Sequence, residues 1–256
     1  MPIWNQNGVY DGVRPNVIFP VTSGLVLFLD AAVSTSYPGT GTTWTDLSGL
    51  NNTGTLVNGP TFSSVSGGAI VFDGVDDYVS ITETSGMTPN VLTLECVFEV
   101  LSDTNSNSGG APTTDQFICL RQNSRTSAFE GYTVAYNETN RRILIVTTPA
   151  GGGQSILNST NNSIPLNTKI HATILYDTTQ QSIYINGSLN AGPAAKSSGI
   201  DYNSTHTLKI GRAVAVGSAY EGPFNGRIYA FRIYNRILTA AEITQNFNAF
   251  RVRYGI

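Results

Sequence analysis

The sequence has little charge, and what it has is not concentrated in a basic patch. Only 12% of the 256 residues are charged, the formal net charge is −3, and the only lysines are Lys169, Lys196 and Lys209. A protein that binds a phosphate backbone or an anionic membrane surface carries clustered lysine and arginine on one face. We therefore expect neither nucleic acid nor a membrane among the partners.

Cysteine and long apolar runs are also scarce. The two cysteines, Cys96 and Cys119, lie in strand-like segments, and we expect both to be reduced core residues. No apolar run reaches the ~20 residues of a transmembrane helix. No charged segment followed by an apolar one opens the chain, as it would in a signal peptide. The sequence thus predicts a protein with neither a membrane span nor a cleaved leader.

Histidine is the third shortage. His171 is expected on the outer face of a strand, and His206 lies in a turn-rich segment. Neither is in a G-x-S-x-G context, and two histidines with two dispersed cysteines do not form a spaced zinc motif. Serine hydrolases and zinc enzymes are therefore not favoured, and we expect both histidines to be exposed polar residues.

Turn-forming residues, by contrast, are abundant. With 26 glycines and 11 prolines, the composition is typical of an all-β protein whose short strands are joined by turns, and sandwiches of this length are commonly single domains. The Asn186-Gly187 pair predicts a type I′ hairpin. Alternating or apolar runs predict strands at residues 25–32, 92–100, 116–121, 131–137, 142–148, 169–176, 208–212 and 226–236.

The apolar period changes from two to about 3.6 after the last predicted strand. Thr239 and Glu242 form the capping-box pattern T-A-A-E, and Ile243, Phe247 and Phe250 then line one helical face. We expect one short C-terminal helix that covers an edge or a face of the sandwich.

The N-terminal residues 1–23 differ from the rest of the chain. They contain Pro2, Pro15 and Pro20 and show little periodicity, which predicts an extended arm ahead of a domain at residues 24–256. The arm either packs on its own domain or reaches a neighbouring subunit, and the sequence leaves both open.

The segment at residues 70–81, IVFDGVDDYVSI, is predicted to form a strand, a turn and a second strand. Asp73-Gly74 supplies the left-handed backbone that a sharp reversal needs. The turn therefore gathers several carboxylates at one corner of the fold.

Two interpretations of this acidic corner remain open. Asp73, Asp76 and Asp77 are candidate Ca²⁺ ligands, with Asp46 and Asp30 as additional ligands, because Ca²⁺ takes 6 to 8 oxygen atoms. Aspartate also accepts backbone N–H groups in tight turns, and a capped turn is the interpretation that the sequence favours. No other cofactor is indicated.

Six stretches follow one another along residues 24–255: GLVLFLDA, WTDLSGLNNTGTLVNGP, FDGVDDYV, IYINGS, LKIGR and FNGRIYAFRIYNRILTAAEITQNFNAFRVRYG. In this order they resemble the laminin-G-like, concanavalin A-like jelly-roll superfamily. The resemblance implies two antiparallel sheets, with the first and last strands as neighbours and loops gathered at a rim. The closing NFNAFRVRYG also resembles the ends of such modules in tailed bacteriophages, often in virion proteins.

That superfamily includes glucanases with a Glu-x-Asp-x-Glu strand, so residues 95–99 require comparison with that pattern. Val97 stands where the middle Asp would be. On a regular strand the Cα atoms of Glu95 and Glu99 are ~13 Å apart, and no third acid is in line to separate their pKa values. We expect no enzyme activity.

Aromatic side chains outside the regular strands are the candidates for ligand binding. Trp4, Tyr202 and Tyr220 could form a platform for a glycan, or they could pack loops. Six of the eleven arginines fall in the last quarter of the chain, a bias that suits subunit contacts.

The function most consistent with these features is recognition or assembly. We expect a virion surface protein of a phage, either a capsid decoration or a fibre component, that contacts virion or homo-oligomer subunits. The alternative is a secreted or cell-surface carbohydrate-binding module, dependent on Ca²⁺, with glycans as partners.

Overall fold

A computed structural model describes residues 20–104, 115–121, 131–148, 153–196, 200–202, 207–213 and 222–256. Trp4, Tyr220, His206 and the first 19 residues of the predicted arm lie outside this part of the chain. Within it, no helix is long and apolar enough to span a membrane.

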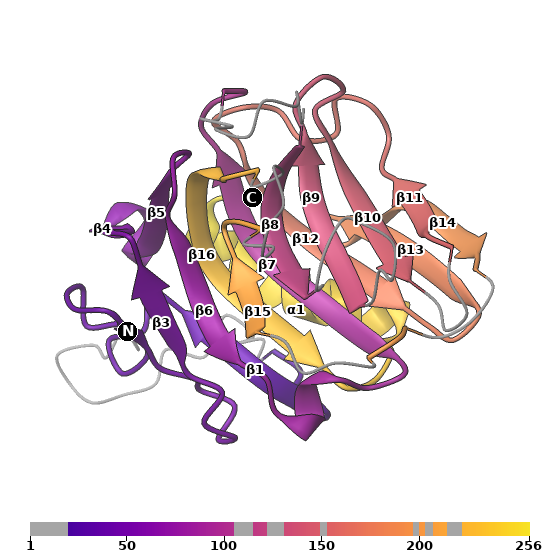
Figure 1. The fold of residues 1–256 in the computed structure, drawn as a ribbon, viewed down its shortest axis with the longest axis horizontal. Coiled ribbons are helices and arrows are strands. Elements are labelled where there is room, and N and C mark those ends of the chain that lie inside the picture. Colours follow the sequence, from indigo (N-terminus) through magenta and orange to yellow (C-terminus); the bar gives the residue numbers. More distant parts are fainter. Residues whose placement is uncertain are drawn as a thin grey trace, which may run out of the picture.

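Two antiparallel sheets pack face to face (Figure 1). Sheet A contains β1 (Leu25–Asp30), β4 (Thr61–Ser63), β5 (Ala69–Asp73), β7 (Leu92–Val100), β12 (Lys169–Tyr176), β13 (Gln180–Ile185), β14 (Ser188–Ala195) and β16 (Asn225–Tyr234). Its order is β14-β13-β12-β7-β16-β5-β4. The first strand, β1, pairs with the second half of β16, next to β5.

Sheet B contains β2 (Thr43–Trp44), β3 (Gly54–Val57), β6 (Tyr78–Thr82), β8 (Asp115–Arg121), β9 (Gly131–Asn137), β10 (Arg142–Thr148), β11 (Ser155–Asn158) and β15 (Thr207–Ile210). Its order is β11-β10-β9-β8-β15-β6-β3-β2. The short 3₁₀ helices η1 (Val65–Gly67) and η2 (Ser85–Met87) lie in connections, and α1 (Ala240–Tyr254) follows β16. The predicted all-β two-sheet jelly roll with one C-terminal helix is confirmed.

The main core lies between the two sheets. Alternate residues of β7, such as Leu94 and Phe98, pack in one cluster with Ile118 and Val134 of sheet B. Burial of apolar side chains of this size stabilises the fold by roughly 1.5–3 kcal/mol each. Both cysteines are buried in this core as free thiols, as predicted.

The predicted hairpin at Asn186-Gly187 is confirmed. These two residues join β13 to β14 with φ angles of 49° and 77°. A type I′ turn requires positive φ at both central positions, and the Asn-Gly pair adopts it at low cost.

The acidic corner takes a different path from the one predicted. Its two strands form, but β5 belongs to sheet A and β6 to sheet B, so the turn is a crossover between sheets and not a reversal within one sheet. Ile70 and Phe72 reach the core from one sheet, and Val79 and Ile81 reach it from the other. Core burial on both sides therefore decides the path, which the local alternation of residues does not reveal.

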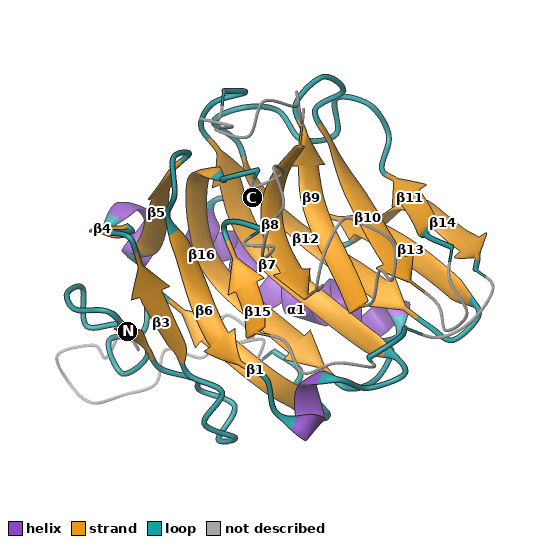
Figure 2. Cartoon of the chain, in the orientation of Figure 1, coloured by secondary structure: helices purple, strands orange, loops and turns teal. Residues whose placement is uncertain are grey.

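Helix α1 begins and ends as its sequence indicates. The Thr239 and Glu242 capping box is present, and Gly255 closes the helix in the left-handed conformation with φ of 69°. The helix lies across the outer face of sheet A, behind the strands in Figure 2, and it buries Ile243 and Phe250 there.

The outer face of β7, which carries two glutamates, is consequently not exposed to solvent. Glu95 and Glu99 retain only 2% and 8% of their accessible surface, and Val97 retains 2%. Alternation along a strand shows which residues share a face. It does not show that a helix more than 140 positions later covers that face.

Candidate functional site

The acidic corner gathers three carboxylates where β5 ends and the chain crosses to β6. One side-chain oxygen from each of Asp73, Asp76 and Asp77 lies within 4.8 Å of the others. Asp73 is exposed, Asp76 is half-buried and Asp77 retains only 4% of its accessible surface. The structure thus brings together the three residues that the sequence singled out.

Part of this arrangement is a capped turn. Asp73 Oδ1 accepts the backbone N–H of Val75 at 2.7 Å, and Asp77 Oδ2 accepts the N–H of Asp73 at 3.1 Å. The other oxygen of Asp77, Oδ1, is buried and has no hydrogen-bond partner among the described residues. Burial, together with the charges of Asp73 and Asp76, raises the pKa of Asp77 to about 6.

Two polar side chains at this corner were not picked out from the sequence. Asn58 Nδ2 and Arg212 Nη1 both donate to the backbone oxygen of Asp76, at 3.0 and 3.1 Å. The Asn58-Gly59 dipeptide is a local turn signal. Asn58 and Arg212 lie beside the corner because β3 and β15 both pair with β6, and no local sequence pattern predicts this pairing.

The corner has the donor chemistry of a Ca²⁺ site. Its side chains offer only hard oxygen ligands, and the unpartnered Oδ1 of Asp77 gains an interaction if a cation binds. The guanidinium of Arg212, which donates to the backbone oxygen of Asp76, lowers the net negative charge of the corner. Backbone oxygens and water would have to complete the 6 to 8 ligands that Ca²⁺ takes.

The two additional candidate ligands are engaged elsewhere. Asp46 accepts the backbone N–H groups of Phe28, Ser48 and Asn52 at 2.8–2.9 Å, so it organises the loop after β2. Asp30 pairs with Arg253 of α1 at 2.6 Å. Neither belongs to the acidic corner.

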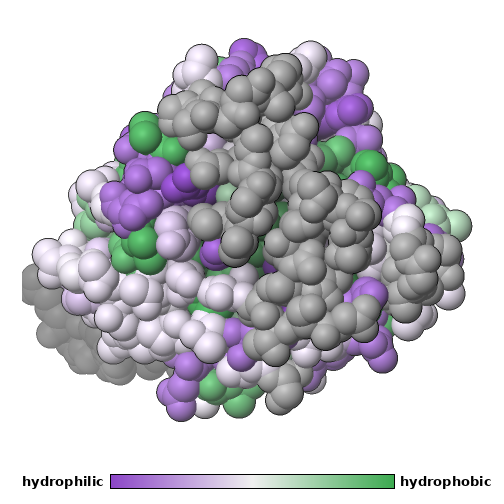
Figure 3. All heavy atoms as spheres, in the orientation of Figure 1, coloured by the Kyte–Doolittle hydropathy of each residue, from purple (hydrophilic) through white to green (hydrophobic). Residues whose placement is uncertain are grey.

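Polar contacts continue along the same rim of the sandwich. Asn225 pairs with Asp73 across the β5–β16 ladder. It donates its backbone N–H to Gln116 Oε1 at 2.8 Å and its side-chain Nδ2 to the backbone oxygen of Thr104 at 3.3 Å. Asp103 accepts Tyr136 Oη at 2.5 Å and pairs with Arg141 at 2.6 Å. On the face that Figure 3 shows, the described hydrophobic atoms form only small, separated patches among polar ones.

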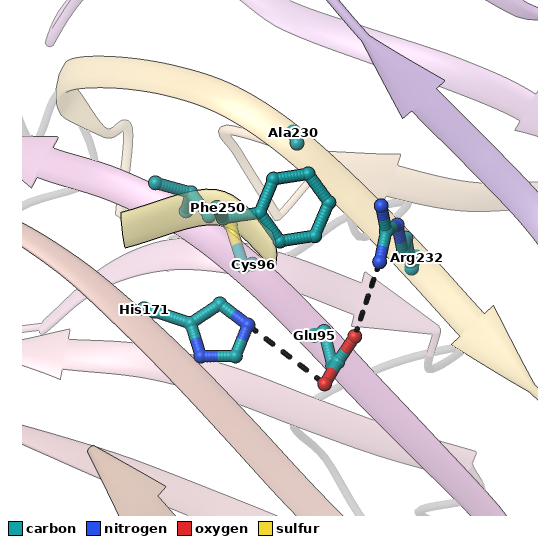
Figure 4. A pocket seen from close by; sticks show the side chains of 7 residues that line it. Glu95, Cys96, His171, Ala230, Arg232 and Phe250 are labelled. Atoms are coloured by element: carbon teal, nitrogen blue, oxygen red, sulfur yellow. Dashed lines mark ion pairs between the residues drawn. The ribbon is translucent and has the colours of Figure 1, made fainter. Parts of the chain in front are cut away.

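The second acidic site lies beneath α1 (Figure 4). Asn246 Nδ2 donates to Glu95 Oε2 at 2.9 Å, Arg232 Nη1 lies 3.6 Å from the same oxygen, and His171 Nε2 lies 3.8 Å from Oε1. A small cavity of about 10 Å³ is lined by Glu95, His171, Arg232 and Phe250. Burial raises the pKa of Glu95, and the charge of Arg232 and the hydrogen bonds oppose that effect.

The Glu99 carboxylate is also paired within the protein. Its Oε2 accepts Arg227 Nη1 at 2.9 Å and the Tyr229 hydroxyl at 2.8 Å. Val97, between the two glutamates, packs in an apolar cluster with Tyr229 and Tyr254. A glycoside hydrolase needs both carboxylates in contact with substrate, and both members of this pair are buried.

The prediction that His171 is exposed is wrong. Its side chain is 1% exposed, and its ring centroid lies 5.9 Å from that of Phe247 and 6.2 Å from that of Phe250. Burial and the nearby charge of Arg232 lower its pKa to about 3. The histidine is therefore neutral at physiological pH.

Of the three candidate binding aromatics, only Tyr202 lies in the described part of the chain. Its ring packs on the guanidinium of Arg121, 4.8 Å from the ring centroid, and Arg121 forms an ion pair with Glu83 at 2.7 Å. The side chain is half-buried against the main core. This geometry gives Tyr202 a packing contact, and a role in ligand binding stays a prediction.

Comparison with known proteins agrees with this architecture. A laminin-G-type family model, described as "Concanavalin A-like lectin/glucanases superfamily", matches residues 73–244. No curated protein sequence matches the chain significantly.

Similar solved structures show the same fold at low sequence identity. The binding domain of Paraclostridial Mosquitocidal Protein 1 is 19% identical with a TM-score of 0.65, over 89% of this chain and 52% of that one. The binding domain of Botulinum neurotoxin DC, solved with rat synaptotagmin II, is 15% identical with a TM-score of 0.64, over 88% and 51%. A Trypanosoma rangeli sialidase in complex with sialic acid is 15% identical with a TM-score of 0.61, over 90% and 33%. The chain therefore spans about half, or less, of these proteins.

Proposed function

This chain belongs to the concanavalin A-like lectin/glucanases superfamily, and we propose that it is a non-catalytic recognition and assembly module of a phage virion surface. In this role it is a capsid decoration or a fibre component. The resemblance of its closing stretch to tailed-phage modules supports the virion assignment.

The observation that carries the non-catalytic part is the position of Glu95 and Glu99. Both carboxylates are buried and paired with arginines, and Asn246 of α1 donates to Glu95. A substrate would have to displace α1 to reach Glu95, and it would have to displace Arg227 and Tyr229 to reach Glu99. Such a face suits structural stability and does not suit glycoside hydrolysis.

The structural neighbours favour recognition as the general role. One of them is a toxin binding domain in complex with a protein, rat synaptotagmin II, and another is a sialidase in complex with sialic acid. The fold thus occurs in proteins that have protein partners and in proteins that have glycan partners, and fold alone does not choose between them.

The assembly hypothesis is tested with a shortened N-terminus. The deletion should cover residues 1–19 and spare Pro20 to Ser23, because Val21 and Ser23 are hydrogen-bonded to the domain. We expect the shortened protein to keep its melting temperature but to lose self-association, measured by light scattering, and to lose binding to purified virus particles. The full chain is the matched control. Unchanged self-association, or no binding of the full chain to particles, would contradict the proposal.

A Ca²⁺-dependent carbohydrate-binding module is the second candidate, favoured by the acidic corner. The buried, unpartnered Oδ1 of Asp77 beside two further carboxylates is the specific observation. Millimolar Ca²⁺ should then raise the melting temperature of the protein relative to chelator, and the Asp77→Asn variant should lose this rise. Asp177→Asn, in the β12–β13 turn, is the control variant. A melting temperature independent of Ca²⁺, with no hit on a glycan array, would exclude this candidate.

A further inference from the structure

Two parts of the chain that are far apart in sequence are tied to one buried carboxylate, that of Glu95. Asn246 of α1 donates to Glu95 Oε2 through Nδ2 and accepts the backbone N–H of Val21 through Oδ1, at 2.9 and 2.7 Å. The Tyr234 hydroxyl donates to Val21 O at 3.0 Å and lies 3.5 Å from Glu95 Oε2. The helix and the segment at Val21 are therefore held on sheet A by a single network.

His171 lies under the same helix, and its nearest charged neighbour is Glu95, whose Oε1 lies 3.8 Å from the histidine Nε2. Neither of its ring nitrogens makes a hydrogen bond with the described residues, and the rings of Phe247 and Phe250 pack against it. Figure 4 shows Phe250 beside the histidine. The guanidinium of Arg232 lines the same cavity, stacked between Phe28 and Phe250 at 4.2 and 4.0 Å. A second positive charge at this place would be buried beside the first, which is strongly unfavourable.

We propose that His171 is the trigger of an acid-sensitive latch: a proton on its imidazole releases α1, together with the segment at Val21, from sheet A. Release exposes the ring to water, which solvates the imidazolium and separates it from Arg232. The latch is a local opening of the fold, and the sandwich core between the sheets stays intact.

The direction of the effect follows from proton linkage. The pKa of His171 is about 3 with the helix in place and 6.5 when the ring is exposed. The open form therefore binds the extra proton, and acidification below pH 6.5 favours opening until the pH reaches about 3. Above pH 6.5 the histidine is neutral in both forms and contributes no pH dependence.

The other charged groups around the helix set the background. Burial raises the pKa of Glu95, so opening releases a proton from this residue above its exposed pKa, which opposes the effect of His171. Arg232 faces the histidine from β16. Arg251 stacks on Phe247, and Arg253 stacks on Phe250 and pairs with Asp30 of β1.

Amide hydrogen exchange of the full chain tests the latch. The opening equilibrium of residues 240–254 is measured between pH 7 and pH 4 for the wild type and for His171→Phe, after correction for intrinsic exchange rates. The ratio of the two opening constants should grow roughly eightfold between pH 6 and pH 5. His171→Gln, which keeps a polar side chain but does not titrate, guards against a packing effect of the phenyl ring.

Each outcome decides the proposal. The proposal is supported if the ratio of the wild-type opening constant to that of each His171 variant rises on acidification, and if this rise is confined to α1 and the Val21 segment. The control variant His206→Gln should behave as wild type. The same pH dependence in wild type and variants would show that other groups control opening and would overturn it. Faster exchange that extends equally to β9 and β10 would show global acid unfolding and would also overturn it.

Discussion

At the scale of single residues, buried carboxylates separate stability from function in this protein. Asp77 and Glu95 are both nearly inaccessible to solvent. The carboxylate of Glu95 has several polar partners, whereas Oδ1 of Asp77 has no hydrogen-bond partner among the described residues. A buried ionised group without a partner costs free energy. The fold tolerates this cost at the acidic corner, and substitution of Asp77 distinguishes a Ca²⁺ site from a capped turn.

The first prediction concerns Asp77 without added metal. Its pKa is raised from 3.8 to about 6 in the folded protein. A raised pKa stabilises the fold below pH 3.8, and that contribution is lost as the pH rises through 6. Asp77→Asn in chelator should therefore unfold at higher urea concentration than wild type at pH 7.5, by roughly 1–2 kcal/mol. The difference should vanish near pH 3.5. A less stable variant at pH 7.5 in chelator would contradict this reasoning.

The second prediction compares the two covered glutamates. Glu95→Ala leaves Arg232 buried without its carboxylate and should cost about 3–5 kcal/mol in urea unfolding. Glu99→Ala should cost less, roughly 1–3 kcal/mol, because its partner Arg227 is 28% exposed and can be solvated. Equal losses for the two variants would show that burial of the arginine is not the deciding factor.

At the scale of elements, local patterns locate the strands well. The predicted limits of β7, β9, β10 and β12 agree with the structure, because alternation along each strand reports burial against one sheet partner. Alternation fails where burial comes from a distant element. The polar row of Glu95 and Glu99 indicates a solvent-facing side, and only Val97 within that row hints that something apolar covers it.

The acidic corner shows the same limit. Its three aspartates are close in sequence, so their clustering could be predicted. The crossover between sheets and the approach of Asn58 and Arg212 could not, because they depend on strand order. Trp4 and Tyr220 stay predictions, since they lie outside the described residues.

The third prediction concerns the start of α1. Thr239→Ala removes the oxygen that accepts the Glu242 N–H and should lower the free energy of unfolding by about 1 kcal/mol. Thr244→Ala, one turn further on an exposed surface, is the control and should change it by less than about 0.5 kcal/mol. The loss should shrink as the pH falls from 4.5 towards 2. Hydrogen bonds from Arg236 and Thr239 lower the Glu242 pKa to about 2, so the contribution is present above pH 4.5 and lost in that window.

At the scale of the whole molecule, one shared core fixes the behaviour of both cysteines. Burial raises the pKa of both thiols. The fourth prediction is that a thiol reagent labels Cys96 and Cys119 only in denaturant, and that a reductant leaves the melting temperature unchanged. Labelling of the native protein within seconds would show that the sheets separate readily.

The pairing of β1 with β16 also determines when sheet A can form during synthesis of the chain. Among the described strands, β16 alone pairs with β1, and it also joins β7 to β5. On a ribosome, where the chain emerges at about 5–20 residues per second, sheet A remains in three separate pieces until residues 225–234 appear. Until then the edge of β1 has no strand to pair with, and an unpaired edge can associate with other chains. We therefore expect the nascent chain to be prone to aggregation through most of its synthesis.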